Sequence, residues 1–283
     1  MIKAGGFEIR WYGVMIAMAF LAGLWLARRE ARRKEMDPSL VDEFSYIVFP
    51  AALLGARIYY VLFSDAQFFL RHPLKIAALW EGGLAIHGAI LSGTAAALWF
   101  TRRRKIPFLR WADTLAPSII LGQAIGRFGC FMNGDAFGVP TRMPWGVVYS
   151  PDSPAGARFP GIPLHPTQLY ELVLDAMIFL ILWRTRKKTL PTGLLFFFYA
   201  MLYSLARIGV EFFRADSLYI VEHLRAAHGL GVIIIVLSAL SIFIIHRRGI
   251  SLEPRIPGGN PVILYRRKPQ AHKKRGVKKL PGI

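Results

Sequence analysis

Seven apolar segments, separated by short polar connections, constrain the fold of this chain more than any other feature. Each has close to the roughly 20 residues that a helix needs to cross the hydrocarbon core of a bilayer. Inside that core every backbone N–H and C=O group must find a partner within the protein, and a helix achieves this within one segment. We therefore predict an all-α polytopic membrane protein with seven transmembrane helices, at residues 12–28, 44–63, 84–101, 111–133, 166–184, 193–213 and 228–246.

Basic residues are concentrated in every second connection. The chain carries 36 Lys and Arg against 17 Asp and Glu, a formal net charge of +19. Nucleic-acid-binding proteins also show such an excess, but here it lies in short runs after the first, third and fifth segments and in the C-terminal region. This pattern is typical of cytoplasmic loops, so it predicts an N-terminus outside and a C-terminus inside.

We expect two regions in the chain. Residues 1–249 form an integral membrane domain with a long, proline-rich outer loop at 134–165, and residues 250–283 form a basic cytoplasmic tail that we expect to be disordered. Long loops of this kind are usually functional or mobile. The segment 67–80 is equally consistent with an interfacial segment on the outer surface and with a plain connecting loop. A single cysteine excludes an internal disulfide bond, and no Cys/His cluster predicts a metal site.

Charged and polar residues within or directly beside the predicted spans gather near the outer ends of these spans. A charged side chain at the centre of a bilayer costs on the order of 2.5 kcal/mol or more, so such residues usually face an interior site. The outer half of the bundle is therefore the predicted site, and its arginines indicate an anionic ligand. The residues concerned are Tyr12, Arg57, His87, Arg127, His165, Arg207, Glu211 and Arg214.

The end of the fourth predicted span carries the strongest of these signals. Arg127 lies among glycines, which permit close helix packing or expose backbone N–H groups. Asn133, Gly134 and Asp135 then end the helix and begin a polar loop. An arginine beside opened backbone predicts a site for an anionic group.

Three further elements each allow a structural and a functional interpretation. Arg207, Glu211 and Arg214 share one helix face, either as a structural ion pair or as a phosphate site with a positive excess. His87 serves either as a helix–helix hydrogen-bonding residue or as a proton acceptor at neutral pH. The run 165–171 opens a helix, and simple capping would explain it.

The stretch 126–138 resembles the signature of the prolipoprotein diacylglyceryl transferases. It reads Gly-Arg-Phe-Gly-Cys-Phe-Met-Asn-Gly-Asp-Ala-Phe-Gly, against Gly-Arg-x-Gly-Asn-Phe-x-Asn-x-Glu-x-x-Gly in that family, so Cys130 and Asp135 depart from it. Further similarities follow in the family's order, so that six of the seven predicted spans carry one. They lie at residues 10–13, 55–60, 87–88, 165–171 and 207–214, and Ala89 departs from the family's His-Gly-Gly element.

The resemblance implies an enzyme of bacterial lipoprotein maturation. The family transfers the diacylglyceryl group of phosphatidylglycerol to the lipobox cysteine thiol of a prolipoprotein, at the outer leaflet of the inner membrane. Glycerol 1-phosphate leaves in this first step of maturation, and no cofactor or metal is expected. The implied partners are phosphatidylglycerol, the signal peptide of the prolipoprotein and the bilayer, without nucleic acid.

The resemblance also implies roles for individual residues. His87 is the expected catalytic base, and Arg127 and Arg207 are the expected catalytic residues that bind the lipid phosphate. If the family's asparagine donates a hydrogen bond to substrate, Cys130 would donate poorly in its place. Further substrate-binding residues are expected at Tyr12, Arg57, Asn133, Gly134, Asp135, His165, Tyr170, Glu171, Glu211 and Arg214.

A function of another class also fits these features. A seven-span bundle with arginines facing a cavity would suit a transporter or receptor for an anionic ligand. The chain shows no strong half-to-half repeat of the kind found in transporters. It also contains neither His-Glu-x-x-His nor Gly-x-Ser-x-Gly, motifs that would indicate an intramembrane hydrolase.

Overall fold

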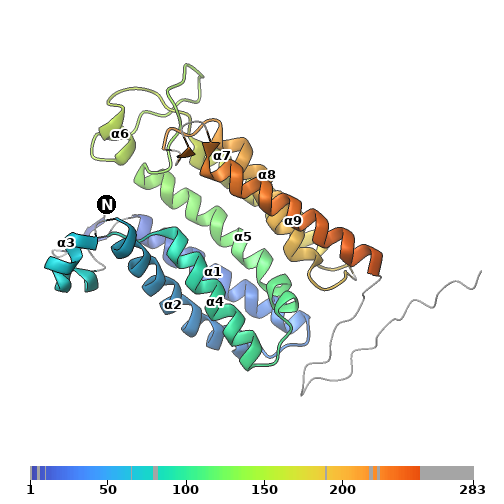
Figure 1. The fold of residues 1–283 in the computed structure, drawn as a ribbon. Coiled ribbons are helices and arrows are strands. Elements are labelled where there is room, and N and C mark those ends of the chain that lie inside the picture. The colour runs from blue at the N-terminus through green and yellow to red at the C-terminus, as the bar shows by residue number, and fades with distance from the viewer. Residues whose placement is uncertain are drawn as a thin grey trace, which may run out of the picture.

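Seven long helices make up most of the described part of the chain in this computed structural model (Figure 1). The structure describes residues 2–4, 7–9, 11–64, 66–78, 82–188, 190–216, 219–221 and 224–248. Each long helix contains most of one predicted apolar segment. The helices are α1 (Trp11–Arg33), α2 (Ser39–Phe63), α4 (Ile86–Arg103), α5 (Phe108–Asn133), α7 (Thr167–Thr185), α8 (Leu194–Glu211) and α9 (Ala226–Arg248).

Five of these helices, α1, α2, α5, α8 and α9, are long and apolar enough to cross a membrane. The other two are more polar, since α4 ends in Arg102 and Arg103 and α7 carries Glu171 and Asp175. Apolar side chains such as Leu237, which is 57% exposed, cover the outside of the helices, as lipid-facing residues do. The chain is therefore a helical, multi-pass membrane protein.

The central helix of the bundle is α5. It packs along α1 on one side and along α7 and α8 on the other, and it also touches α4 (Figure 1). The other helix pairs in contact are α2 with α4, α8 with α9, α7 with α8, and α1 with α2. Residues on α5 can therefore meet residues from both halves of the bundle.

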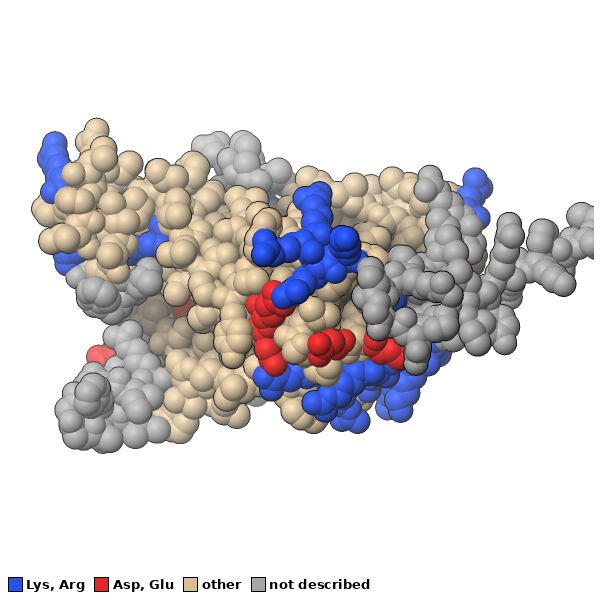
Figure 2. Space-filling view, turned by 90° about the horizontal axis from the view of Figure 1, so that it is seen from below, with Lys and Arg blue, Asp and Glu red and all other residues tan. Residues whose placement is uncertain are grey.

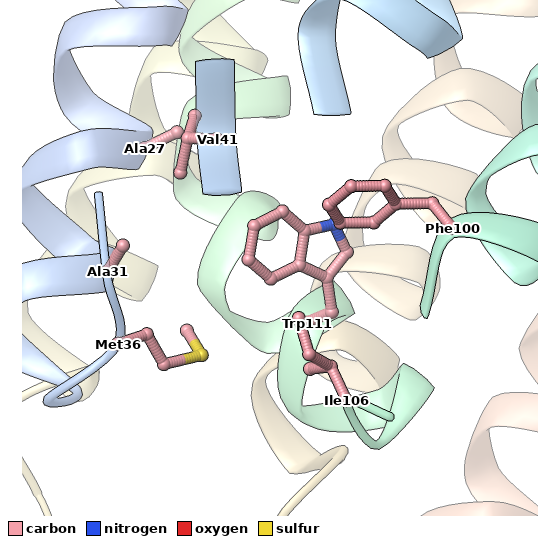
Figure 3. Packing of buried hydrophobic residues seen from close by; sticks show 7 residues of the cluster. All are labelled: Ala27, Ala31, Met36, Val41, Phe100, Ile106 and Trp111. Carbon is pink, nitrogen blue, oxygen red and sulfur yellow. The ribbon is translucent and has the colours of Figure 1, made fainter. Parts of the chain in front are cut away.

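Aromatic side chains close the end of the bundle where α1 connects to α2 and α4 connects to α5 (Figure 3). The buried ring of Trp111 meets Phe44 edge-on, with centroids 5.3 Å apart, and Phe100 packs against Phe44 at the same distance. Met36 and Ile106, from the two connections, cover this cluster. Aromatic pairs of this geometry contribute about 0.5–1.5 kcal/mol beyond area burial, so the cluster ties four helices together.

Basic side chains gather at the same end. Figure 2 shows Lys and Arg side chains beside acidic ones on the surface seen from below. Two of the ion pairs here are partly exposed to solvent, Arg28 with Asp42 and Arg104 with Glu43. Ion pairs at the surface contribute about 0–1 kcal/mol each to folding stability, so these two pairs add little to the stability of the bundle.

A buried carboxylate on α5 determines where α8 begins. Asp113 Oδ2 accepts a hydrogen bond from the N–H of Gly193 at 2.6 Å, and its Oδ1 accepts one from Phe196 at 2.7 Å. N–H groups in the first turn of a helix have no partner within that helix, and a carboxylate also suits the positive end of the helix dipole. Asp113 thereby fixes the start of the helix whose other end carries Arg207.

Short elements fill the connections between the long helices. The 134–165 loop contains α6 (Pro154–Arg158), and two antiparallel hairpins pair β1 (Ile2–Ala4) with β2 (Phe7–Ile9) and β3 (Tyr219–Val221) with β4 (Leu224–Arg225). The all-α prediction is right for the bundle and omits these hairpins. Strands of two or three residues are too short to show the alternating pattern by which strands are recognised.

The segment after α2 is helical in its described part. It contains α3 (Ala66–Arg71) and the 3-10 helix η1 (Pro73–Ala77), with Leu70 and Leu74 81% and 89% exposed. These exposed apolar side chains support the interfacial alternative for the described part of residues 67–80. The predicted tail at 250–283 lies outside the described residues.

The backbones of α2 and α4 approach each other at two glycines. A Cβ atom on Gly88 would lie 2.1 Å from the carbonyl oxygen of Gly55, and one on Gly55 would lie 2.0 Å from Ser92 Oγ. Just before α4, the N–H of Ala85 donates to the carbonyl of Ala56 at 3.0 Å. Small residues that let backbones meet are typical of helix interfaces in membranes.

We expect Gly88→Ala to destabilise the protein, because its Cβ would meet a backbone atom that moves only if the helices separate. Overpacking of this kind costs typically about 1–3 kcal/mol, which should lower the midpoint of thermal unfolding in detergent. Gly93→Ala is the matched control on the same helix, since its Cβ would lie 3.7 Å from Ala52 Cβ, an ordinary contact. Equal midpoints for the two variants would contradict the close approach.

Candidate functional site

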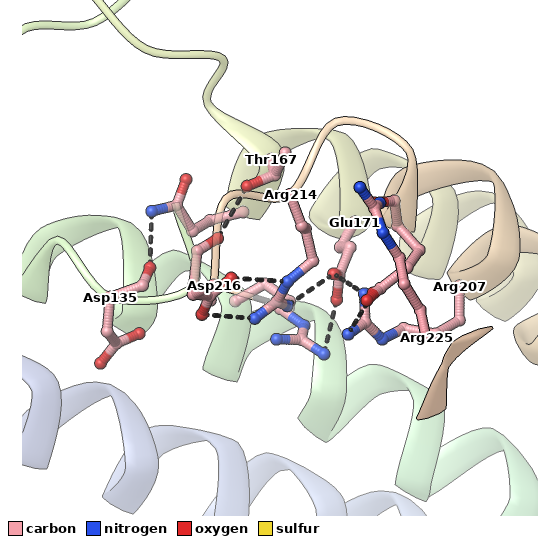
Figure 4. A network of polar contacts seen from close by, with 11 residues as sticks. Asp135, Thr167, Glu171, Arg207, Arg214, Asp216 and Arg225 are labelled. Atoms are coloured by element: carbon pink, nitrogen blue, oxygen red, sulfur yellow. Dashed lines mark hydrogen bonds and ion pairs between the residues drawn. The ribbon is translucent and has the colours of Figure 1, made fainter. Parts of the chain in front are cut away.

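Three arginines from two helices and a following loop converge on one buried carboxylate, Glu171, in the first half of α7 (Figure 4). Arg127 of α5 places Nη2 2.5 Å from Glu171 Oε2. Arg207 of α8 and Arg214, just after α8, place Nη1 3.1 and 3.3 Å from Glu171 Oε1. We call these four residues the Glu171 cluster. It confirms none of the predicted roles by itself, but it brings four of the predicted site residues together.

Two further carboxylates hold the arginines from α8. The expected ion pair of one helical turn is present, with Arg207 Nη2 2.8 Å from Glu211 Oε2. Asp216 accepts from Arg214 Nε at 2.9 Å and Nη2 at 2.7 Å. Burial opposes the charge of Arg214, but Asp216 and then Glu171 outweigh this effect and raise its pKa. Three arginines (Arg127, Arg207 and Arg214) therefore pair with three carboxylates (Glu171, Glu211 and Asp216). The excess of positive charge that the sequence predicted at this site is largely neutralised.

The arginines are more accessible than the carboxylate that they share. The side chains of Arg127 and Arg207 are 20% and 22% exposed, against 5% for Glu171. A guanidinium group has five N–H donors in a planar fork, so Arg127, paired with Glu171, and Arg207, paired with Glu171 and Glu211, both keep further donors. A buried carboxylate thus orients two guanidinium groups that can still bind an anion.

The loop after α5 is fastened to the start of α7. Gly134 ends α5 with φ +74° and donates to the carbonyl of Cys130 at 2.8 Å. Asn133 Nδ2 donates to Asp135 Oδ2 at 2.8 Å, and Gln168 Nε2 donates to the Asp135 carbonyl at 2.6 Å. The predicted residues Asn133, Gly134 and Asp135 therefore form one local structure at the end of the helix that carries Arg127.

Aromatic residues form a second local structure beside α7. His165 Nδ1 lies 3.0 Å from Tyr170 Oη, which also accepts a hydrogen bond from Trp145 Nε1 at 2.8 Å. The rings of His165 and Phe213 are 5.2 Å apart. A Cβ on Gly138 would lie 2.5 Å from the carbonyl oxygen of His165, which explains the glycine in this position. His165 and Tyr170 thus share one contact network. This network includes Phe213, the residue that precedes Arg214.

Tyr12 lies where α1 meets α5. A Cβ on Gly129 would lie 3.5 Å from the Tyr12 ring and 3.0 Å from Met15 Cβ, so a larger residue at 129 would push α1 away. Gly129 is two residues after Arg127, and Cys130 beside it is partly exposed. Tyr12 is therefore placed near the α5 part of the predicted site.

Arg57 has a different environment from the other predicted site residues. Its Nε donates to the carbonyl of Ile76 at 2.9 Å, and its Nη1 and Nη2 donate to those of Lys75, Ala78, Gly82 and Gly83 at 2.5–3.3 Å. Five donors are thus used on five backbone carbonyls. These contacts give Arg57 a structural part in holding the segment between α2 and α4, and they offer no support for the predicted substrate contact.

His87 begins α4 and belongs to the same pair of helices as Arg57. Its ring lies 5.7 Å from that of Tyr59 on α2, and the residue is exposed. The structure therefore places His87 on the α2–α4 pair, while the Glu171 cluster comes from α5, α7 and α8. The end of α5, the start of α7 and the end of α8 nevertheless lie at the same end of the bundle as the start of α4 (Figure 1).

The structure also shows polar residues near the site that the sequence-based prediction omitted. Asp175 is 2% exposed, lies one turn after Glu171 on α7 and interacts electrostatically with Arg127. Its spacing from Glu171 in an apolar segment was a readable signal. Asp216 and Gln168 gave no such signal. An aspartate in a loop and a glutamine in the first turn of a helix are both common in proteins, so neither indicates a site. Among the described residues, no group of His, Cys, Asp and Glu could hold a metal ion.

We expect Glu171→Gln to destabilise the protein strongly, because it leaves three partly buried guanidinium groups without their shared carboxylate. Breaking a buried ion pair by removing one partner costs about 3–5 kcal/mol. The exposed Glu43 pairs with Arg104, so Glu43→Gln is the matched control and should cost about 0–1 kcal/mol. Thermal unfolding in detergent measures both, and a Glu171→Gln midpoint equal to that of the control would mean that the cluster contributes no stability.

Comparison with known proteins identifies the family. A sequence profile described as prolipoprotein diacylglyceryl transferase matches residues 1–244. The phosphatidylglycerol–prolipoprotein diacylglyceryl transferase of Trichormus variabilis is 43% identical over 228 residues, 77% of this chain and 79% of that protein. Proteins of the same name from Symbiobacterium thermophilum and Fusobacterium nucleatum are 40% and 38% identical, over 84% and 87% of this chain and 88% and 96% of their own. Since the match covers most of both chains, this protein belongs to the prolipoprotein diacylglyceryl transferase family.

Proposed function

We propose that this protein transfers the diacylglyceryl group of phosphatidylglycerol to the lipobox cysteine thiol of a prolipoprotein, the first step of lipoprotein maturation. The family is one of transferases, and the names of the curated relatives contain both substrates. Within this chain, the observation that carries the proposal is the presence of accessible Arg127 and Arg207 over buried Glu171. Guanidinium groups held in this way suit the phosphate of a lipid headgroup.

The proposed reaction exchanges one bond at the glyceryl carbon. The thiolate sulfur forms a bond to that carbon, the bond from the carbon to the phosphate ester oxygen breaks, and glycerol 1-phosphate leaves with an added negative charge. Arg127 and Arg207 would stabilise this developing charge, because donors already oriented toward it need no rearrangement during the reaction. Glu171 beneath them would keep their orientation.

The thiol of the second substrate needs a proton acceptor. A cysteine with a pKa near 8.5 is mostly protonated at pH 7, so a base that removes the proton increases the reactive thiolate. We propose His87 for this role. Its exposure at the start of α4 supports access to a substrate that approaches between the α2–α4 pair and the Glu171 cluster. Tyr12, Asn133, Gly134, Asp135, His165, Tyr170 and Glu211 are proposed to shape the surroundings of the reacting groups.

We also propose that all seven long helices cross the bacterial inner membrane, with the N-terminus outside. Basic residues in the last turns of α1 and α4, and Arg186 after α7, support this orientation. It would place the Glu171 cluster at the outer leaflet, where an exported prolipoprotein arrives.

Thiol labelling tests the orientation. An Ile283→Cys variant should resist a membrane-impermeant thiol reagent applied to intact cells, since the C-terminus is expected inside. An Asp152→Cys variant in the outer loop should react, and the unmodified chain measures the background from Cys130. Robust labelling at position 283 would reverse the proposed topology.

Activity measurements test the phosphate-binding arginines. Purified protein in detergent, given phosphatidylglycerol and a lipobox peptide, should form the lipidated peptide, which a transporter would not do. Arg127→Lys and Arg207→Lys keep the charge but lose the planar fork, so we expect turnover to fall by about 100-fold or more. Arg142→Lys on the exposed outer loop is the matched control. Near-normal turnover in both site variants would remove these arginines from the proposed mechanism.

The dependence of rate on pH tests His87. His87→Gln retains hydrogen bonding but cannot accept the proton, so the rate at pH 7 should fall by at least about 100-fold. The loss should shrink as the pH approaches the pKa of the substrate thiol, because thiolate then forms without help. A structural role would instead lower the unfolding midpoint and leave the shape of the pH profile unchanged. A parallel decrease at every pH would exclude His87 as the base.

A further inference from the structure

A second set of arginines surrounds a buried glutamate at the opposite end of the bundle. Glu30 of α1 is fully buried, Arg33 Nε donates to its Oε2 at 2.8 Å, and Arg186, just after α7, pairs with its Oε1. We call Glu30, Arg29, Arg33 and Arg186 the Glu30 group. Glu171 and Arg186 are 15 residues apart along α7, so about 22 Å of helix separates this group from the Glu171 cluster. That distance is most of the roughly 30 Å of the hydrocarbon core, so the two groups lie toward opposite membrane surfaces.

The Glu30 group has more positive charge than its one carboxylate neutralises. Arg186 is 5% exposed, and within the described part of the chain its Nε has no hydrogen-bond partner. Burial lowers the pKa of Arg186, and although Glu30 acts in the other direction, Arg33 and Arg29 lower it further. An anion bound nearby would reduce the repulsion among the arginines.

Arg29, like Arg33, is an exposed member of the group. Its guanidinium carbon lies 5.6 Å from the ring centroid of Trp25 and 5.5 Å from that of Trp183. Its neighbour Arg28 pairs with Asp42, whereas no carboxylate in the described residues pairs with Arg29. A guanidinium group stacked on aromatic rings keeps its N–H donors free at the edge, where an anion can bind.

Apolar side chains lead from the middle of the membrane to Arg29. Leu21 and Trp25 are 62% and 59% exposed and share one face of α1 with Arg29, at a spacing of four residues. On α7, Leu180 is 50% exposed and lies one turn before Trp183. Both helices pack on α5, and tryptophan is typical of the level where acyl chains end and headgroups begin.

We propose that Arg29, with Arg33 and Arg186, binds the headgroup phosphate of an anionic phospholipid whose acyl chains lie along α1 and α7. The exposed apolar rows indicate a lipid and not a free anion, and basic pockets between helices on the cytoplasmic side are a common form of headgroup site. The site is separate from the Glu171 cluster, and it does not depend on the reaction proposed above.

Thermal unfolding of the full chain in mixed micelles tests the lipid. Phosphatidylglycerol at about ten times its dissociation constant should raise the unfolding midpoint by about 3–5 °C. Phosphatidylcholine, which has the same chains and no net charge, should raise it much less, and so should inorganic phosphate. An equal rise with phosphatidylcholine would exclude a preference for anionic headgroups, and a full rise with inorganic phosphate would mean that a free anion is the ligand.

Substitutions assign the effect to the Glu30 group. Arg29→Gln should lose a clear part of the rise with phosphatidylglycerol, whereas Arg103→Gln should keep it. Arg103 is an exposed arginine that lies over one ring, Trp99, at 5.4 Å, so it is a matched control. Lipid bound at the Glu171 cluster contributes equally in both variants. An equal rise of the unfolding midpoint in the two variants would overturn the proposal. Phosphatidylglycerol with brominated acyl chains gives a second measurement, because bromine quenches nearby tryptophan, and equal quenching in the two variants would also overturn it.

Discussion

A carboxylate buried in a membrane bundle has no water to stabilise its charge, and Glu171 obtains that stabilisation from three guanidinium groups. These groups come from α5, from α8 and from the loop after α8, so the ion pairs connect segments that are far apart in the sequence. The requirement for charge compensation therefore determines how α5, α7 and α8 meet. The same requirement keeps the arginines oriented, which is the property that a phosphate site needs.

The position of Arg207 depends on a second carboxylate far from the site. Asp113 holds the first turn of α8, and Glu171 holds Arg207 near its last turn. On α5, Asp113 and Arg127 are separated by about 21 Å, the rise of 14 helical residues. Since α8 is attached to neighbouring helices at both ends, it can neither slide nor turn without breaking one of these attachments. The position of Arg207 thus depends on the lengths of α5 and α8 as well as on its contact with Glu171.

Sequence patterns predicted the long helices because a bilayer demands long apolar segments, and they identified Arg127, Arg207 and Glu211 because charges in such segments are costly. The central role of Glu171 was not predictable, since a glutamate in the first turns of a helix is also explained by the helix dipole. The role of Arg57 was not predictable either. Its partners are backbone carbonyls, which every residue possesses and which leave no trace in the sequence.

That dependence on backbone has an evolutionary consequence for the segment between α2 and α4. Arg57 binds the backbone carbonyls of Lys75, Ile76, Ala78, Gly82 and Gly83 and none of their side chains. Side chains at these positions are therefore free to change without loss of these hydrogen bonds, provided that Arg57 remains. The two glycines are the exception: both have positive φ, and a Cβ on Gly83 would lie 2.6 Å from Arg57 Nη1. Across related proteins, we expect this part of the surface to diverge in sequence while its path is inherited.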